Sequence, residues 1–218
     1  MVEKQVMLTP SKITAWLECE HYLTLKINDE LRPKKEWIKE VAVKQEPNSG
    51  LMAPPEDFAD MLRKKGDLHE QRCLSRYKET FPNSVFEVPE RNEAGYENFA
   101  EWVQRIGNPM EENYSVIFQM PFIHEGIRGV ADFLLREEYG NGKVAYEPVD
   151  SKLSRTGAKQ GHLLQLLFYA EAVEAKTGIR PRQVHVLLGS GEMESFNVRD
   201  YWWYWKRLQR PVSYTHLR

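Results

Sequence analysis

The sequence has few cysteines, no excess of positive charge and no long apolar run. Cys19 and Cys73 are too few for a disulfide framework and do not form a zinc-binding pattern by themselves. The formal net charge is −2, so any contact with nucleic acid must come from local patches rather than a general basic field. No run approaches the roughly 18 apolar residues of a membrane span, and residues 1–4 lack the apolar core of a signal peptide. We therefore expect a cytoplasmic protein that does not associate with membranes.

The composition is that of a globular domain, with 41% hydrophobic and 28% charged residues in a chain of 218. This length suits one domain with a substantial core, which we expect to span residues 1–210. Residues 28–55 are rich in proline and alternating charge and are expected to form a loop-rich insertion. Residues 211–218 continue no periodic pattern. We expect them to be a non-native tail and the natural protein to extend further.

The hydrophobic spacing predicts an α/β domain whose mixed central sheet is flanked by helices. The predicted helices cover residues 10–20, 56–81, 93–106, 160–176 and 200–208. The predicted sheet has a three-stranded antiparallel meander over residues 115–123, 127–136 and 144–151, and a further strand over 184–188. Short strands are also expected over residues 84–88 and 195–198.

Two acidic residues lie inside these apolar, strand-like runs. Asp132 follows Gly129-Val130-Ala131, and Asp150 is followed two positions later by Lys152. Residues i and i+2 of a strand share a face, so Asp150 and Lys152 should point the same way. Two carboxylates about 4 Å apart repel by roughly 4 kcal/mol, so a partly buried pair would hold a proton or recruit a cation. Oxygen ligands with one imidazole suit Mg²⁺ or Mn²⁺, and this pattern is typical of metal-assisted phosphodiester hydrolysis.

Each of these signals alone also has an ordinary structural interpretation. Either aspartate could simply end a strand, and a D-x-K triplet is common by chance. His69 lies within a predicted helix, where most histidines are surface or boundary residues. Gln165 and Tyr169 are i,i+4 neighbours on an apolar helix, and a buried Gln requires a polar partner unless this stripe faces solvent.

Other polar residues carry weaker signals. Glu147 should fall on the opposite face from Asp150, which favours a structural role. Arg155 and Lys159 follow the acids and could meet a phosphate backbone, although such a run is usually a solvated loop. The aromatic and basic residues 201–207 could stack on bases, but core packing at helical spacing is the better interpretation.

The order and spacing of the polar residues resemble the PD-(D/E)xK nuclease superfamily, and specifically its RecB-like branch. In that branch a helix carries G-x-x-H-E, a strand G-x-x-D, the next strand D-x-K and a following helix Q-x-x-x-Y. All four patterns occur here in that order, at residues 66–70, 129–132, 150–152 and 165–169. Flanking similarity extends the match over most of residues 8–208. The chain is similar to the RecB-like nuclease module that is often fused to a superfamily-one DNA helicase.

The resemblance implies a restriction-endonuclease-like core that carries a metal-dependent deoxyribonuclease site. His69, Asp132 and Asp150 would bind Mg²⁺ or Mn²⁺ with a main-chain carbonyl near Leu153, and Lys152 would be the catalytic lysine. Gln165 and Tyr169 would orient DNA or the catalytic strand.

A departure from the family concerns iron. Relatives often hold an iron–sulfur cluster between one early cysteine, matched here by Cys19, and three late cysteines that this sequence lacks. Such a cluster needs four thiolates, so we expect it only in a longer natural protein and not in this chain.

Three functions remain open from the sequence. The first is a Mg²⁺- or Mn²⁺-dependent nuclease acting on single-stranded or end-exposed DNA, exonuclease-like, in DNA repair or processing. The second is a catalytically silent DNA-binding or assembly module that supports a helicase. The third is a site-specific endonuclease on the same fold. The sequence does not decide between exonuclease and endonuclease, or between DNA and RNA.

Overall fold

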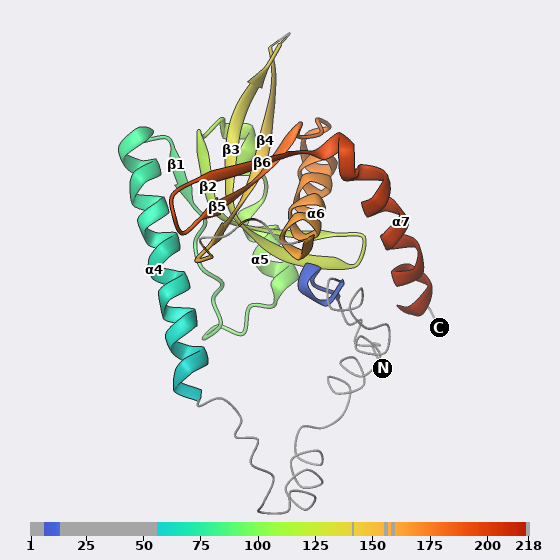
Figure 1. Ribbon diagram of the computed structural model, residues 1–218, viewed down its shortest axis with the longest axis horizontal. Coiled ribbons are helices and arrows are strands. Elements are labelled where there is room, and N and C mark those ends of the chain that lie inside the picture. Colours follow the sequence, from blue (N-terminus) through green and yellow to red (C-terminus); the bar gives the residue numbers. More distant parts are fainter. Residues whose placement is uncertain (1–6, 14–55, 141, 155–156, 158–159, 217–218) are drawn as a thin grey trace, which may run out of the picture.

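A six-stranded sheet forms the centre of the computed structural model, which describes residues 7–13, 56–140, 142–154, 157 and 160–216 (Figure 1). The strands lie in sequence order: β1 (Val85–Glu87), β2 (Val116–His124), β3 (Ile127–Tyr139), β4 (Lys143–Lys152), β5 (Gln183–Leu188) and β6 (Met193–Asn197). Strands β2, β3 and β4 form the predicted antiparallel meander. Strand β5 is the further strand and pairs parallel to β4, while β6 pairs antiparallel to β5 and β1 parallel to β2. The mixed sheet is therefore confirmed.

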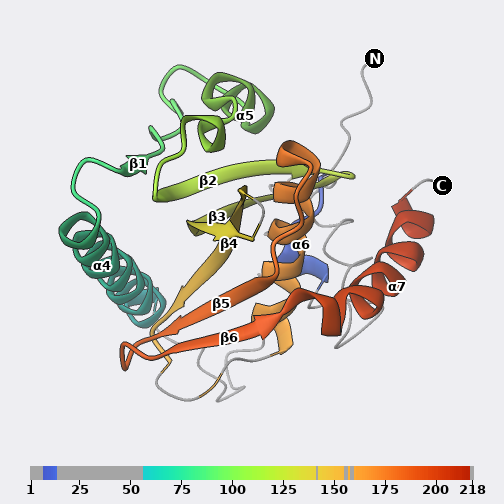
Figure 2. The same cartoon turned by 90° about the horizontal axis from the view of Figure 1, so that it is seen from above.

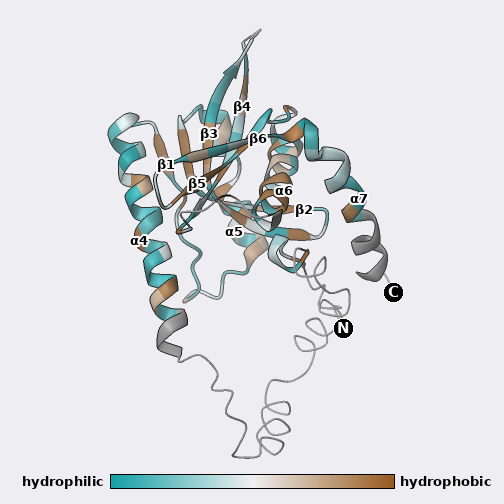
Figure 3. Ribbon diagram, in the orientation of Figure 1, coloured by the Kyte–Doolittle hydropathy of each residue, from teal (hydrophilic) through white to brown (hydrophobic). Residues whose placement is uncertain are grey.

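Helices cover both faces of this sheet (Figure 2). They are α4 (Glu56–Thr80), α5 (Phe99–Ile106), α6 (Gln160–Thr177) and α7 (Val198–His216), with a short 3-10 turn η1 (Pro109–Glu112). Helix α4 lies on one face and α6 on the other. Helix α6 is apolar along most of its length, whereas α4 is largely hydrophilic (Figure 3). Among its described side chains, α4 buries Cys73 and Leu74 against the sheet.

Two helix boundaries differ from the sequence prediction. The helix predicted from residue 93 begins at Phe99, because Asn98 caps it by accepting from the backbone of Ala100 and Glu101. Helix α7 is longer than predicted, and the backbone of residues 211–216 continues it. The insertion at 28–55 lies outside the described residues, as does the first predicted helix beyond Ile13.

The alternation of β2 and β3 reverses at one point. Val116 and Phe118 pack on the α4 side, yet both Ile117 and Met120 pack on the α6 side. The reversal occurs at Gln119, whose φ is 60°. Strand β3 reverses at the facing position, since Phe133 packs on the α4 side while Ala131 and Leu134 pack on the α6 side. The residue between Ala131 and Phe133 is Asp132, so this irregularity coincides with the first strand acid.

Within the described part of the chain, no helix combines the length and apolarity that crossing a membrane requires.

Candidate active site

The central strands bring Asp132 next to the end of β4. Phe133 of β3 pairs with Val149 of β4, so the following position on β4, Asp150, is level with Asp132. The Ser151 backbone N–H donates to Asp132 Oδ2 at 2.8 Å, and the Ser151 hydroxyl approaches the same oxygen at 3.3 Å. These bonds fix the Asp132 carboxylate against the neighbouring strand. The two strand acids are therefore held side by side.

Asp150 is the most buried member of the site. Its side chain is 1% exposed, and Oδ1 accepts from Lys152 Nζ at 2.8 Å and from Gln165 Nε2 at 3.4 Å. Oδ2 is buried and has no hydrogen-bond partner among the described residues. The ion pair agrees with the prediction that Asp150 and Lys152 share a face. A buried carboxylate oxygen without a partner is costly, and it is the position where a ligand would be expected.

Helix α6 holds both acid-bearing strands through Gln165 and Tyr169. Gln165 contacts Asp150, and the Tyr169 hydroxyl donates to the Val130 carbonyl of β3 at 2.6 Å. Gly129 makes this approach possible, because a Cβ at that position would lie 2.8 Å from Tyr169 Oη. The glycine of G-x-x-D is thus complementary to the tyrosine of Q-x-x-x-Y. Both α6 residues contact the acid-bearing strands, while a role in orienting DNA remains a prediction.

Glu70 of α4 belongs to the same cluster, although we assigned it no role from the sequence. Its Oε2 accepts from Gln119 Nε2 at 2.7 Å. Burial, followed by the negative charges of Asp132 and Asp67, raises the pKa of Glu70 to about 7. The sequence feature that could have indicated Glu70 is its position as the last residue of the G-x-x-H-E pattern. The signal for Gln119 was a polar residue within the apolar run of β2.

The electrostatics of the site favour a cation. Burial, and next the charge of Asp150, raise the pKa of Asp132 to about 6. Burial also raises the pKa of Asp150, against the opposing effect of Lys152. Burial alone would lower the pKa of Lys152, but the Asp150 carboxylate outweighs it and the pKa is raised, so the ammonium stays charged. Among the described residues, Lys152 is the ammonium group whose charge lowers the pKa of all three carboxyl groups, those of Glu70, Asp132 and Asp150.

His69 lies beside this cluster rather than at its centre. Its Nε2 is 3.8 Å from Cys73 Sγ, and it lines a hollow of about 100 Å³ between α4 and the turn after β5. The Leu153 carbonyl lies against Gly189, where a Cβ would be 2.4 Å from its oxygen. The predicted metal-binding roles of His69 and Leu153 remain predictions. Arg155, Lys159 and Cys19 lie outside the described residues.

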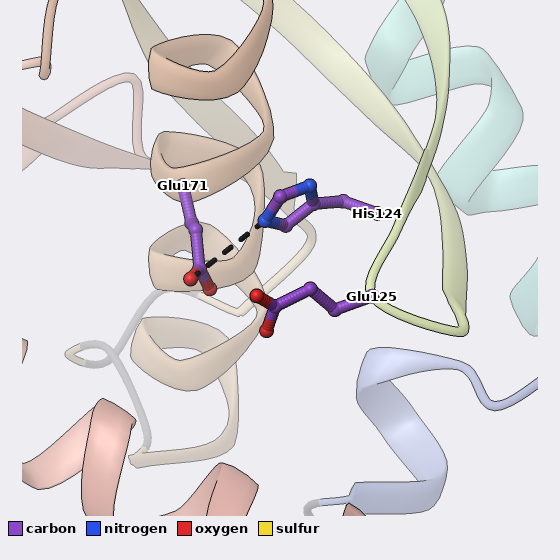
Figure 4. Close-up of side chains that lie close together, drawn as sticks. All are labelled: His124, Glu125 and Glu171. Carbon is purple, nitrogen blue, oxygen red and sulfur yellow. Dashed lines mark ion pairs between the residues drawn. The ribbon is translucent and has the colours of Figure 1, made fainter.

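A second group of potential ligands lies at the far end of β2 (Figure 4). Atoms of His124, Glu125 and Glu171 all lie within 4.8 Å of one another, and in the described part of the chain they are the only such group. His69, Asp132 and Asp150 therefore do not stand that close together in this structure.

The carboxylate of Glu171 already has cationic and neutral donors. It accepts from Lys206 Nζ, and from Trp205 Nε1 and Gln209 Nε2 at 2.6 Å each. Burial would raise the pKa of Glu171, but hydrogen bonds from His124, Lys206 and Trp205 lower it to about 2. The group thus ties α7 to α6 and β2, and a metal ion would have to displace Lys206. We assign it a structural role.

Glu147 faces away from Asp150, as predicted. Its carboxylate accepts from the Tyr139 hydroxyl at 2.6 Å and from the Gln183 backbone N–H at 3.1 Å, and it contacts His185 Nε2 at 2.9 Å. The side chain is buried, and these partners satisfy it. Glu147 therefore joins β4 to β5.

Comparison with models of known protein families and with curated protein sequences gave no match.

Proposed function

We propose that this chain is a Mg²⁺- or Mn²⁺-dependent nuclease that hydrolyses phosphodiester bonds of DNA, exonuclease-like, acting on single strands or exposed ends in repair or processing. The observation that carries this proposal is the convergence of Asp132, Asp150 and Lys152 on adjoining strands. Within it, the buried Asp150 Oδ2 has no hydrogen-bond partner among the described residues.

The donor atoms present are of the kind that a hard divalent cation prefers, although the carboxylates of Glu70, Asp132 and Asp150 do not all come within 4.8 Å of one another in this structure. The carboxylates of Asp132, Asp150 and Glu70 supply oxygen donors, and the His69 imidazole and Leu153 carbonyl are the further ligands that the family resemblance implies. Burial, and next the charges of neighbouring carboxylates, raise the pKa of Asp132 and of Glu70, and a bound cation would offset both effects. A bound cation would polarise a phosphate oxygen and lower the pKa of a water molecule.

The chain's own residues then position the reacting groups. Asp150 holds the Lys152 ammonium, whose side chain is 29% exposed and so can reach a substrate. In that position Lys152 can orient the attacking water or offset negative charge that develops on the phosphate. Gln165 fixes the Asp150 carboxylate. Tyr169 fixes the backbone of β3 two residues before Asp132.

Cleavage of labelled single-stranded DNA in Mn²⁺ tests this proposal. We expect Asp150→Asn and Lys152→Met each to lower the cleavage rate by roughly 100-fold or more, because each removes a preorganised charge from the site. The matched control is Glu137→Gln. It converts a carboxylate to an amide, as Asp150→Asn does, but on an exposed side chain of β3. Full activity in purified Asp150→Asn would refute the assignment.

The same assay separates the alternative functions. A silent module that supports a helicase would bind DNA without cleaving it at any Mn²⁺ concentration. Digestion of linear but not circular single strands would show dependence on an end. Cutting of a circular duplex at a fixed position would instead show a site-specific endonuclease.

A further inference from the structure

One face of α4 presents basic side chains to the turn between β5 and β6. His69, Arg72 and Arg76 are spaced i, i+3 and i+7, so they lie along one stripe of the helix. Together with Gly189, Ser190 and Gly191 they line the hollow of about 100 Å³. The hollow thus has guanidinium groups on one wall and backbone with a hydroxyl group on the other.

The described part of the chain offers no hydrogen-bond or ion-pair partner that would explain the position of the two arginines. Neither guanidinium makes a hydrogen bond or ion pair with another described residue, and both side chains are exposed. Arg76 Nη1 lies 3.5 Å from where a Cβ at Gly191 would stand, and the φ of Gly191 is +87°. The positive φ favours glycine at this turn, and the Arg76 guanidinium lies close to it. Unpaired guanidinium groups around a small hollow are suited to an anion.

The hollow adjoins the acid cluster. Leu187, which also lines it, pairs with Ser151, and the Ser151 N–H donates to Asp132. Cys73 also lines the hollow. Burial raises the pKa of its thiol, Arg76 opposes that effect, and Glu70 and Asp132 add to it. An anion held by the arginines would therefore be a near neighbour of a group at Asp132 and Asp150.

We propose that this hollow binds a phosphate group of the nucleic-acid strand, next to the phosphodiester that meets Asp132, Asp150 and Lys152. This inference rests on the proposed nuclease function and identifies where the substrate backbone is held. The chain carries a net charge of −2 and its cleavage site is acidic, so the strand needs a local source of positive charge. Arg72 and Arg76 supply it with a forked geometry that matches phosphate oxygens.

The test is the affinity of the purified chain for a short 3′-fluorescein-labelled oligothymidylate, measured by fluorescence anisotropy in EDTA over a range of salt concentrations. We expect the double variant Arg72→Gln, Arg76→Gln to bind roughly 10-fold or more weakly, since hydrogen bonds to charged groups are lost. The salt dependence should become shallower by about 0.7 for each phosphate contact removed. The thermal unfolding midpoint should not change, because the arginines have no partner in the described part of the chain.

The matched control is Arg63→Gln on the same helix. Arg63 pairs with Asp60 and lies nine positions before Arg72, which places it on the opposite side of α4. Equal affinity and salt dependence in the double variant and in Arg63→Gln would overturn the proposal, as would failure of the unaltered chain to bind the oligonucleotide.

Oligonucleotides with and without a 5′-phosphate distinguish a terminal from an internal phosphate. If removing the 5′-phosphate lowers the affinity of the unaltered chain but not that of the double variant, the hollow binds the phosphate at a strand end. Equal affinity for the two oligonucleotides, still lowered in the double variant, would assign it to an internal phosphate. Arginine-dependent binding without cleavage in Mn²⁺ would contradict the nuclease function while supporting the phosphate site.

Discussion

Asp132 is placed where its negative charge destabilises the folded chain. Its pKa is raised to about 6, chiefly by burial and then by Asp150, from an ordinary value of 3.8. A folded-state pKa above the unfolded value means that stability is lost as the pH rises from about 4 to about 6, because the folded chain resists ionisation. Active sites commonly retain such charges at the expense of stability.

We therefore expect Asp132→Asn to raise the free energy of unfolding at pH 7 in EDTA, by roughly 1–3 kcal/mol. Asparagine can still accept the Ser151 N–H bond through its amide oxygen. The gain should disappear below about pH 4, where the aspartate is protonated in both states. Urea unfolding at pH 4 and pH 7 measures this, with Glu137→Gln as the control. A variant that is less stable than the parent at pH 7 would contradict this account of Asp132.

The contact of Gly129 with Tyr169 gives a second prediction for single residues. Gly129→Ala places a methyl group 2.8 Å from Tyr169 Oη and 3.0 Å from its Cε1, so we expect a loss of roughly 1–3 kcal/mol in stability. Tyr169→Phe alone should cost about 1 kcal/mol by removing the bond to the Val130 carbonyl. The double variant should lose less than the sum, because phenylalanine lacks the clashing oxygen. Strictly additive losses in urea unfolding would show that the two positions are not coupled.

At the scale of elements, Glu171 joins α6 to α7. Its pKa of about 2 lies below the ordinary 4.5, so its contribution to stability is fully present above about pH 4.5 and is lost as the pH falls towards 2. That difference corresponds to about 3 kcal/mol. We expect Glu171→Gln to remove stability of this order at pH 7, since Lys206 then loses its anionic partner.

The acid-induced loss of stability should be correspondingly smaller in Glu171→Gln than in the parent. Glu174→Gln is the matched control on the same helix. Its pair with Arg180 is partly exposed, and such surface pairs contribute little. Thermal unfolding followed between pH 2 and pH 7 measures both variants. Identical acid unfolding of the parent and Glu171→Gln would exclude Glu171 as the residue that stabilises the contact between α6 and α7.

The hydrophobic period predicted most elements, but not their irregular points. Apolar, strand-like runs bounded by turn residues located β2, β3, β4 and β5, and apolar residues at helical spacing located α4 and α6. The predicted start of α5 was wrong by several residues, because the Asn98 side chain rather than the apolar spacing determines where this helix begins. The reversal at Gln119 and Asp132 could not be predicted, because a positive φ at a non-glycine residue leaves no mark on the apolar pattern.

At the scale of the whole molecule, the site combines residues that are far apart in the sequence. The i,i+2 rule predicted that Asp150 and Lys152 share a face, and the order of motifs indicated Asp132, Gln165 and Tyr169. The sequence did not indicate that Glu70 would contact Gln119, because that contact depends on how α4 lies across β2. The hollow between α4 and the β5–β6 turn also arises only when the chain is folded.

The described part of the molecule offers two places where a divalent cation could be sought, the acid cluster at Asp132 and Asp150 and the group at His124, and the proposed function requires the first to bind it. Mn²⁺ binding, followed by the loss of the sharp electron paramagnetic resonance signal of the free ion, measures this directly. We predict that Asp132→Asn and Asp150→Asn each weaken Mn²⁺ binding strongly, whereas His124→Ala leaves it unchanged. Mn²⁺ binding that survives in both aspartate variants, or that is lost in His124→Ala, would contradict the proposed metal centre.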